Sequence, residues 1–207
     1  MGKKKVLICD DQYLIRQLFS LIVNGSDKYT VVKELQTAYA AADYCREHEV
    51  DLVIMDIVMP DGSNGLDAAE QIKKENPDIK VLIVTSMPEA SYLDHARAIG
   101  VDSFWYKEVE DERLIDVIDR TMNGEHIFPE EAFAVAIGKA KSSDFSKREL
   151  DVLRLMTKGM TDPEIAEELQ LSYETVRTYV KRMTGKTGLS RVRLAIEARA
   201  HGIAIGE

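Results

Sequence analysis

Three runs of consecutive apolar residues constrain the fold of this 207-residue chain more than any other feature. They are VLIC at 6–9, LVIM at 52–55 and VLIVT at 81–85. A strand that is apolar on both sides must be covered on both sides, and such strands occur in parallel sheets flanked by helices. Two further strand-like runs, at 30–35 and 103–106, continue the series. We therefore predict five β-α units forming a doubly wound α/β domain.

The segments between these strands carry apolar residues at helical spacing. After the first strand, Leu14, Leu18, Leu21 and Ile22 repeat at positions i, i+4, i+7 and i+8. This periodicity predicts a helix rather than a further strand.

The cysteine content and the absence of targeting signals favour a cytoplasmic protein. The chain holds two cysteines, Cys9 and Cys45, and no Cys/His spacing that suits a metal. Cys45 shares an apolar helical stripe with Ala41 and Ala42, so we predict a buried thiol. No apolar run reaches the ~18 residues that a membrane span needs, and the stretch after the basic start is too short for a secretory signal. We expect a reducing compartment and no membrane partner.

The net charge of −9 hides a difference between two parts of the chain. Residues 139–207 hold 13 Lys and Arg against 10 Asp and Glu and therefore carry +3, which leaves −12 for residues 1–138. Such an asymmetry suggests two functions in one chain.

A change of pattern places the domain boundaries. Residues 123–144 contain Gly124, Pro129, Gly138 and a Ser-Ser pair, which we interpret as a linker with a short helix at 130–137. We assign the α/β domain to 1–122 and an all-helical domain to 145–207.

Polar residues end the predicted strands on one edge of the sheet. Asp10 and Asp11 follow the first strand, Asp56 follows the third, and Thr85 and Lys107 end the fourth and fifth. Each alone has a plainer explanation, such as a helix cap or a solvated lysine. Ligands of open parallel sheets bind at this edge. Three carboxylates at one point need a cation, for which oxygen ligands favour Mg²⁺, and a lysine and a hydroxyl suit a phosphoryl group.

These motifs resemble the receiver domain of bacterial response regulators. The similarity covers residues 4–122 and is carried by DD at 10–11, MDIVMP at 55–60, VTS at 84–86 and FWYK at 104–107. It implies a flavodoxin-like, five-stranded parallel sheet of order 2-1-3-4-5 and a sensor histidine kinase as phosphoryl donor.

The resemblance also implies a role for each site residue. Asp56 would accept the phosphoryl group, and Mg²⁺ would be held by Asp10, Asp11, Asp56 and the backbone carbonyl of Val58. The remaining roles fall to Thr85 and Lys107, which would contact phosphoryl oxygens, and to Phe104, which would report the movement of Thr85. The loop after Pro60 is one residue longer than is usual for the family, and its effect is open.

The last part of the chain carries the start signals of several helices. Ser146 and Glu149 form a capping-box pattern, Thr161 or Asp162 precedes a helix with Pro in its first turn, and Ser172 precedes a third. Two short helices, a tight turn and a polar, basic second helix are typical of a helix-turn-helix. A plain helical bundle with a solvated charged face is the alternative. The predicted helices span 147–157, 162–169, 173–185 and 191–200.

This part resembles the LuxR/NarL-type DNA-binding domain over residues 145–202. The match is carried in order by REL-VL-L--KG, EIAEEL-LS--TV and GLSRVRLAIEA. It implies four helices that bind double-stranded DNA. By the resemblance Arg177, Thr178 and Lys181 would face base edges in the major groove, and Arg182 and Lys186 would contact phosphates.

The two resemblances together indicate a response regulator of the NarL/FixJ type, a phosphorylation-controlled transcription factor that dimerises when phosphorylated. We expect no enzyme activity beyond weak self-phosphorylation and autodephosphorylation. One alternative is a Mg²⁺-dependent phosphohydrolase with an aspartate nucleophile, but the general acid expected two residues after Asp56 is replaced by Val58. The other is a protein-binding regulator that does not depend on phosphorylation, which the intact acids, Thr85 and Lys107 disfavour.

Overall fold

The computed structural model describes residues 2–86, 90–107, 113–130 and 134–200. The described residues divide into two compact units, one formed by 2–86, 90–107 and 113–130 and the other by 134–200. We describe each unit by itself.

The first unit is built on a parallel sheet. The sheet has the order β2-β1-β3-β4-β5, and all four neighbouring pairs are parallel. The predicted fold class and strand order are therefore confirmed. The three apolar runs are fully buried because helices cover both faces of the sheet. The strands are β1 (Lys4–Cys9), β2 (Tyr29–Leu35), β3 (Leu52–Met55), β4 (Lys80–Thr85) and β5 (Ser103–Tyr106).

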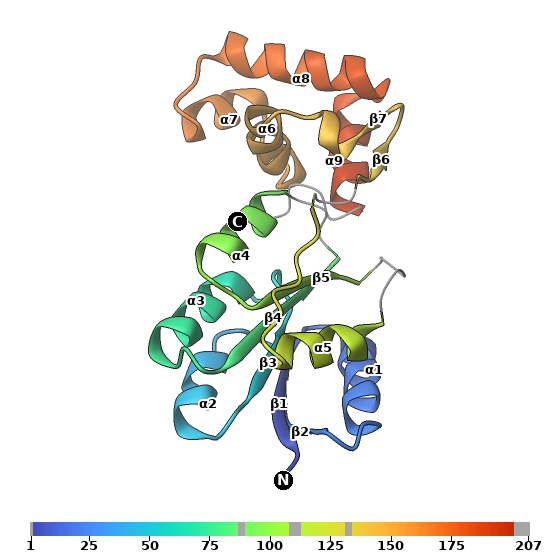
Figure 1. Ribbon diagram of the computed structural model, residues 1–207. Coiled ribbons are helices and arrows are strands. Elements are labelled where there is room, and N and C mark those ends of the chain that lie inside the picture. The colour runs from blue at the N-terminus through green and yellow to red at the C-terminus, as the bar shows by residue number, and fades with distance from the viewer. Residues whose placement is uncertain (1, 87–89, 108–112, 131–133, 201–207) are drawn as a thin grey trace. The chain divides into compact units, whose positions relative to one another are not determined.

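Five helices flank this sheet in two layers. Helices α1 and α5 lie on one face, and α2, α3 and α4 lie on the other (Figure 1). The predicted thiol stripe is confirmed, because Cys45 is buried together with Ala41 and Ala42 on α2. The helices are α1 (Tyr13–Asn24), α2 (Ala41–Glu47), α3 (Gly65–Glu75), α4 (Ala90–Ala98) and α5 (Leu114–Met122).

Helix α1 forms where the periodicity predicts it, but it buries a different face from the one that carried the prediction. Leu14, Leu18 and Leu21 are exposed, with Leu14 at 78%, whereas Phe19 and Val23 are buried against the sheet. Outside a polar stripe with Arg16, Ser20 and Asn24 the helix is apolar, so two apolar stripes of helical spacing compete in its sequence. The stripe with Phe19 meets the sheet, and of the residues that carried the prediction Ile22 also packs against this core, partly buried.

The segment after α5 covers the edge of the sheet. Ile127 forms an isolated parallel bridge with Ser103, and the Phe104 amide donates to its carbonyl at 2.7 Å. Arg97 of α4 donates to the Pro129 carbonyl and holds the segment further along. Residues 127–129 therefore belong to the packing of the first unit.

The second unit contains a helical bundle preceded by a short hairpin. Its buried side chains come from all four helices, including Val152, Ile165, Val180 and Leu194. The elements are β6 (Ala136–Ile137), β7 (Ala140–Lys141), a 3-10 turn (Ser142–Asp144), α6 (Lys147–Thr157), α7 (Asp162–Glu168), α8 (Tyr173–Thr187) and α9 (Arg191–Ala200).

The helix expected at 130–137 is wrong for the described residues there, because 136–137 form a strand of the hairpin. Gly138 turns the chain with φ +59°, and a Cβ atom at this position would lie 2.3 Å from the Thr187 carbonyl. The Lys139 amide donates to that same carbonyl at 2.9 Å. The hairpin therefore packs against the end of α8 and cannot continue as a helix.

The predicted start signals act as caps in the structure. Ser146 and Glu149 form a complete capping box on α6, Thr161 and Glu164 form one on α7, and the Ser172 hydroxyl accepts from the Thr175 amide at α8. Among the described residues, no helix has the length and apolar character needed to cross a membrane.

Candidate functional site

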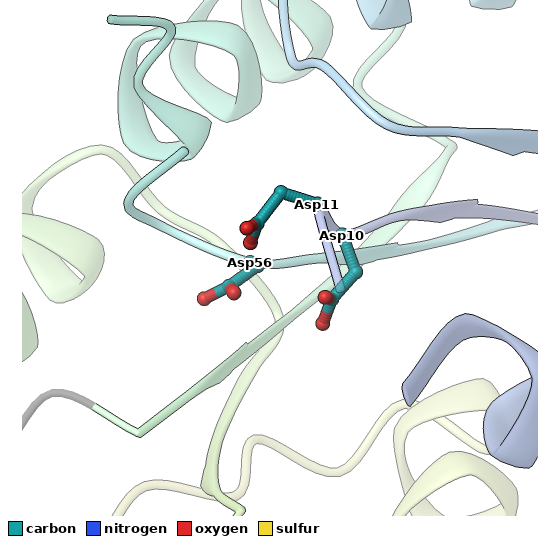
Figure 2. Close-up of side chains that lie close together, drawn as sticks. All are labelled: Asp10, Asp11 and Asp56. Carbon is teal, nitrogen blue, oxygen red and sulfur yellow. The ribbon is translucent and has the colours of Figure 1, made fainter. Parts of the chain in front are cut away.

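Three carboxylates converge at the carboxyl edge of the sheet. Asp10 and Asp11 follow β1 and Asp56 follows β3, so parallel pairing brings them to one point (Figure 2). One oxygen from each lies within 4.8 Å of the others. Asp10 and Asp56 are buried, and Asp11 is partly exposed.

A lysine from the end of β5 bridges two of these acids. Lys107 Nζ donates to Asp10 Oδ2 at 2.6 Å and to Asp56 Oδ2 at 2.8 Å, and the lysine side chain is 7% exposed. The Asp56 carboxylate also accepts from the Ile57 amide at 2.7 Å, and the Asp10 carboxylate from the Gln12 amide at 2.9 Å. A single ammonium thus pairs with two of three neighbouring carboxylates.

The local electrostatics show that this compensation is incomplete. Burial raises the pKa of Asp56 to about 6, with Lys107 opposing the shift and the charge of Asp10 adding to it. Burial, and then the charge of Asp10, also raises the pKa of Asp11. The donor set is all oxygen and carries excess negative charge, which fits a hard divalent cation such as Mg²⁺.

The loop from β3 to α3 holds Asp56 in place. Val58 and Asn64 form an antiparallel bridge, and Asn64 caps α3 by accepting from the Leu66 amide at 2.8 Å. A Cβ atom on Gly65 would lie 1.8 Å from the Asp56 carbonyl oxygen, so only glycine fits there. The loop therefore packs directly against the backbone of Asp56.

The other predicted residues of this site lie in the adjoining strands. Thr85 ends β4, is fully buried, and its carbonyl accepts from the Lys107 amide at 3.0 Å. Phe104 lies inside β5, buried, with its ring edge-on to Tyr106 at 5.1 Å between centroids. The sequence reasoning missed Arg16, whose side chain contacts the backbone of Asp10 and Asp11. Its place one turn into the helix after the two acids could have suggested it.

In the second unit, helix α8 presents a polar face. Arg177, Thr178, Lys181 and Arg182 are exposed, while Val176, Val180 and Met183 are buried on the opposite side. Arg177 lies over the ring of Tyr173 at 6.0 Å. The four predicted residues therefore share the solvent side of one helix.

Lys186 differs from these four residues. Its ammonium donates to both carboxylate oxygens of Glu149, at 2.9 and 2.7 Å, and to the Asp144 carbonyl at 2.8 Å. The Glu149 side chain is 3% exposed and also accepts from the Ser146 amide. All three N–H donors of Lys186 are engaged within the fold, where they link α8 to α6.

Two family matches cover both units. Residues 6–119, more than half of the chain, match the family described as "Response regulator receiver domain", and residues 143–198 match "Bacterial regulatory proteins, luxR family". This chain belongs to the LuxR-type response regulators. That family comprises transcription regulators rather than classical enzymes.

Named relatives of this response regulator span nearly its whole length. "Oxygen regulatory protein NreC" of Staphylococcus carnosus is 33% identical and covers 89% of this chain and 91% of its own. "Response regulator protein VraR" of Staphylococcus saprophyticus is 30% identical, with 96% and 98% covered. RcsB of Salmonella enterica serovar Typhimurium, solved bound to a promoter with phosphomimetic BeF₃⁻, has the same fold, with 20% identity and a TM-score of 0.59 over 93% of this chain and 96% of that chain.

Proposed function

We propose that this response regulator accepts a phosphoryl group on Asp56 from a sensor histidine kinase and, when phosphorylated, binds DNA sequence-specifically as a dimer. The observation that carries this proposal is the position of the Asp56 carboxylate, which lies beside Lys107 and two further acids at the carboxyl edge of the parallel sheet. A cytoplasmic location fits a protein with these two partners.

The residues of the site divide the chemistry of transfer among them. An Asp56 carboxylate oxygen attacks phosphorus and forms an acyl phosphate, while the bond from phosphorus to the donor's leaving group breaks. Lys107, already 2.8 Å from Asp56, is placed to pair with the charge on the transferring oxygens. Thr85, at the end of the neighbouring strand, would supply a hydroxyl to a phosphoryl oxygen.

Magnesium would be held by Asp10, Asp11, Asp56 and the Val58 carbonyl, and it would offset negative charge on the phosphoryl oxygens. Because the site residues act only by their positions, the site can also take a phosphoryl group slowly from a small donor molecule without the kinase. We therefore expect weak self-phosphorylation, and weak autodephosphorylation by water. The phosphohydrolase alternative lacks a general acid at Val58, and the family membership disfavours it.

The acceptor is tested by phosphorylation of the full chain with acetyl phosphate and Mg²⁺. Intact-protein mass spectrometry should show one added phosphoryl group, and Asp56→Asn should remove it while far-UV circular dichroism stays unchanged. Asp61→Asn, a change in the same loop, is the matched control and should keep the label. A label that persists in Asp56→Asn and maps elsewhere would overturn the assignment.

For DNA, we propose that α8 enters the major groove with Arg177, Thr178 and Lys181 toward base edges and Arg182 toward the backbone. Their common exposure on one helix supports this. Lys186 stays a weaker candidate for phosphate contact, because its donors already serve Glu149 and Asp144.

The DNA proposal is tested with sites obtained by in vitro selection. Arg177→Ala should cost about 1–3 kcal/mol on a selected site and relax the preference at one base position per half-site. Arg182→Ala should weaken selected and scrambled sites alike and lower the salt slope by about one unit. Unchanged discrimination in Arg177→Ala, measured in a salt-titrated binding assay, would show that this helix does not read bases as proposed.

A further inference from the structure

The first turn of α1 holds an arginine that contacts the backbone of both aspartates after β1. Arg16 Nη1 donates to the carbonyl oxygen of Asp10 at 2.7 Å and to that of Asp11 at 2.9 Å. The side chain is 12% exposed, and its Nε atom lies 3.9 Å from the Glu34 carboxylate on β2. One largely buried guanidinium therefore connects the turn that bears two acids to the neighbouring strand.

Besides Arg16, the turn formed by residues 10–12 is held by the Gln12 amide, which donates to the Asp10 carboxylate at 2.9 Å. Gln12 occupies the N-cap position of α1 and makes no side-chain capping hydrogen bond. The last strand contact before the turn is the Asp10 amide, which donates to the Leu35 carbonyl at 3.1 Å. After that amide, Arg16 donates hydrogen bonds to two successive carbonyl oxygens. The orientation of these two peptide planes sets the direction in which the Asp10 and Asp11 side chains leave the backbone.

We infer that Arg16 is a positioning residue for the magnesium site. It touches neither the metal ligands' carboxylates nor the acceptor's reacting atoms, and it acts by fixing the backbone from which two carboxylates reach the cation. The inference rests on the proposed function, because it requires Mg²⁺ among Asp10, Asp11 and Asp56. Hydrogen bonds that orient metal ligands from outside are typically worth 10- to 100-fold in metal affinity.

A simple charge argument predicts the opposite sign. Arg16 is a cation close to a cation site, so its removal should raise the affinity for Mg²⁺ if only its charge matters. A positioning role requires the affinity to fall, because freed peptide planes let the two carboxylates turn away from a common centre. The direction of the change therefore separates the two explanations.

The test is a calorimetric Mg²⁺ titration of the full chain in four forms: parent, Arg16→Met, Arg16→Lys and Arg113→Met. Arg16→Met should raise the Kd for Mg²⁺ about tenfold or more. Arg16→Lys keeps the charge and can reach one carbonyl, so its Kd should lie between those of Arg16→Met and the parent. Arg113→Met removes an exposed arginine of the same unit, paired with Asp116, and should leave the Kd unchanged.

Each outcome decides the matter. An Arg16→Met protein that binds Mg²⁺ as tightly as the parent, or more tightly, overturns the positioning role and leaves the proposed function standing. A parent that binds no Mg²⁺ overturns the metal site, and with it this inference. If Arg16→Met does not fold by circular dichroism, Arg16→Lys is decisive, and a Kd equal to the parent's overturns the inference.

Discussion

Each unit of this response regulator buries a carboxylate against a lysine, and the two pairs behave in opposite ways. Asp56 in the receiver shares Lys107 with Asp10 and lies close to Asp11. Glu149 in the helical unit has both of its carboxylate oxygens bonded by Lys186, which pairs with no other carboxylate among the described residues. The pairs differ in the ratio of acids to cations and in the burial of the lysine, which is 7% exposed at Lys107 and 37% exposed at Lys186.

The pKa shifts follow this ratio. Burial raises the pKa of Asp56 to about 6. Lys107, which also pairs with Asp10, lowers this pKa but does not reverse the shift. Burial acts on Glu149 in the same direction, but the hydrogen bonds from Lys186 and Ser146 outweigh it and hold its pKa below the usual value. A satisfied carboxylate stabilises a fold, whereas an undercompensated one is available for a cation and for chemistry.

The largest expected effect of a substitution comes from removing the lysine of the satisfied pair. Lys186→Met leaves the Glu149 charge buried without its cation, which should lower the free energy of unfolding of the helical unit by about 2–3 kcal/mol, less than for a fully buried pair because Lys186 is 37% exposed. Urea denaturation followed by circular dichroism measures this. Lys181→Met, on the exposed face of the same helix, is the control and should change stability by less than about 0.5 kcal/mol. Equal midpoints for both variants would contradict a structural role for Lys186.

The second effect is a dependence on pH, with opposite signs in the two units. Asp56 has a raised pKa, so its contribution to folding is fully present below its ordinary value of 3.8 and is lost as pH rises through about 6. The full shift corresponds to about 3 kcal/mol in metal-free protein. Glu149 has a lowered pKa, so its contribution is present above its ordinary value of 4.5 and is lost as pH falls through its folded pKa.

Carbon-13 NMR of the side-chain carboxyl groups in metal-free protein measures both titrations directly. Asp56→Asn and Glu149→Gln identify the two signals. If Asp56 and Glu149 titrate with the same midpoint pH, the two units do not differ in the pKa of their buried carboxylates.

The third and smallest effect is the response to Mg²⁺. A cation that supplies the missing charge in the receiver should stabilise it by about 1.4 kcal/mol at ten times the Kd. The helical unit should not respond. The melting temperature in millimolar MgCl₂ measures this, with Asp11→Asn expected to lose most of the gain and Asp43→Asn, an exposed acid on α2, to keep it. An unchanged melting temperature in the parent would mean that the acids are not a metal site.

The sequence was sufficient for the five-stranded sheet and for the helices that flank it and form the second unit, because the decisive patterns were local. Unbroken apolar runs such as 52–55 and 81–85 defined buried parallel strands, and caps such as Ser146 and Ser172 defined helix starts. The convergence of Asp10 and Asp56 followed from topology alone, since parallel strands end on one edge.

What the sequence could not supply depends on partners distant in the chain. Both leucine-rich and phenylalanine-bearing stripes of α1 have helical spacing, and only the sheet decides that Phe19 is buried and Leu14 exposed. Lys186 looked like other basic residues of its helix, and its engagement by Glu149, 37 positions away, is visible only in three dimensions. Arg16 was missed for a different reason, because its partners are close in the chain but are backbone carbonyls, which leave no side-chain pattern in the sequence.

The bridge from Ile127 to β5 has a practical consequence for dissecting the protein. A receiver fragment cut at Met122, where α5 ends, would expose the backbone edge of β5, and bare strand edges template self-association. A fragment that runs through Pro129 keeps the edge covered and retains the contact from Arg97. The receiver therefore needs residues beyond the end of its last helix.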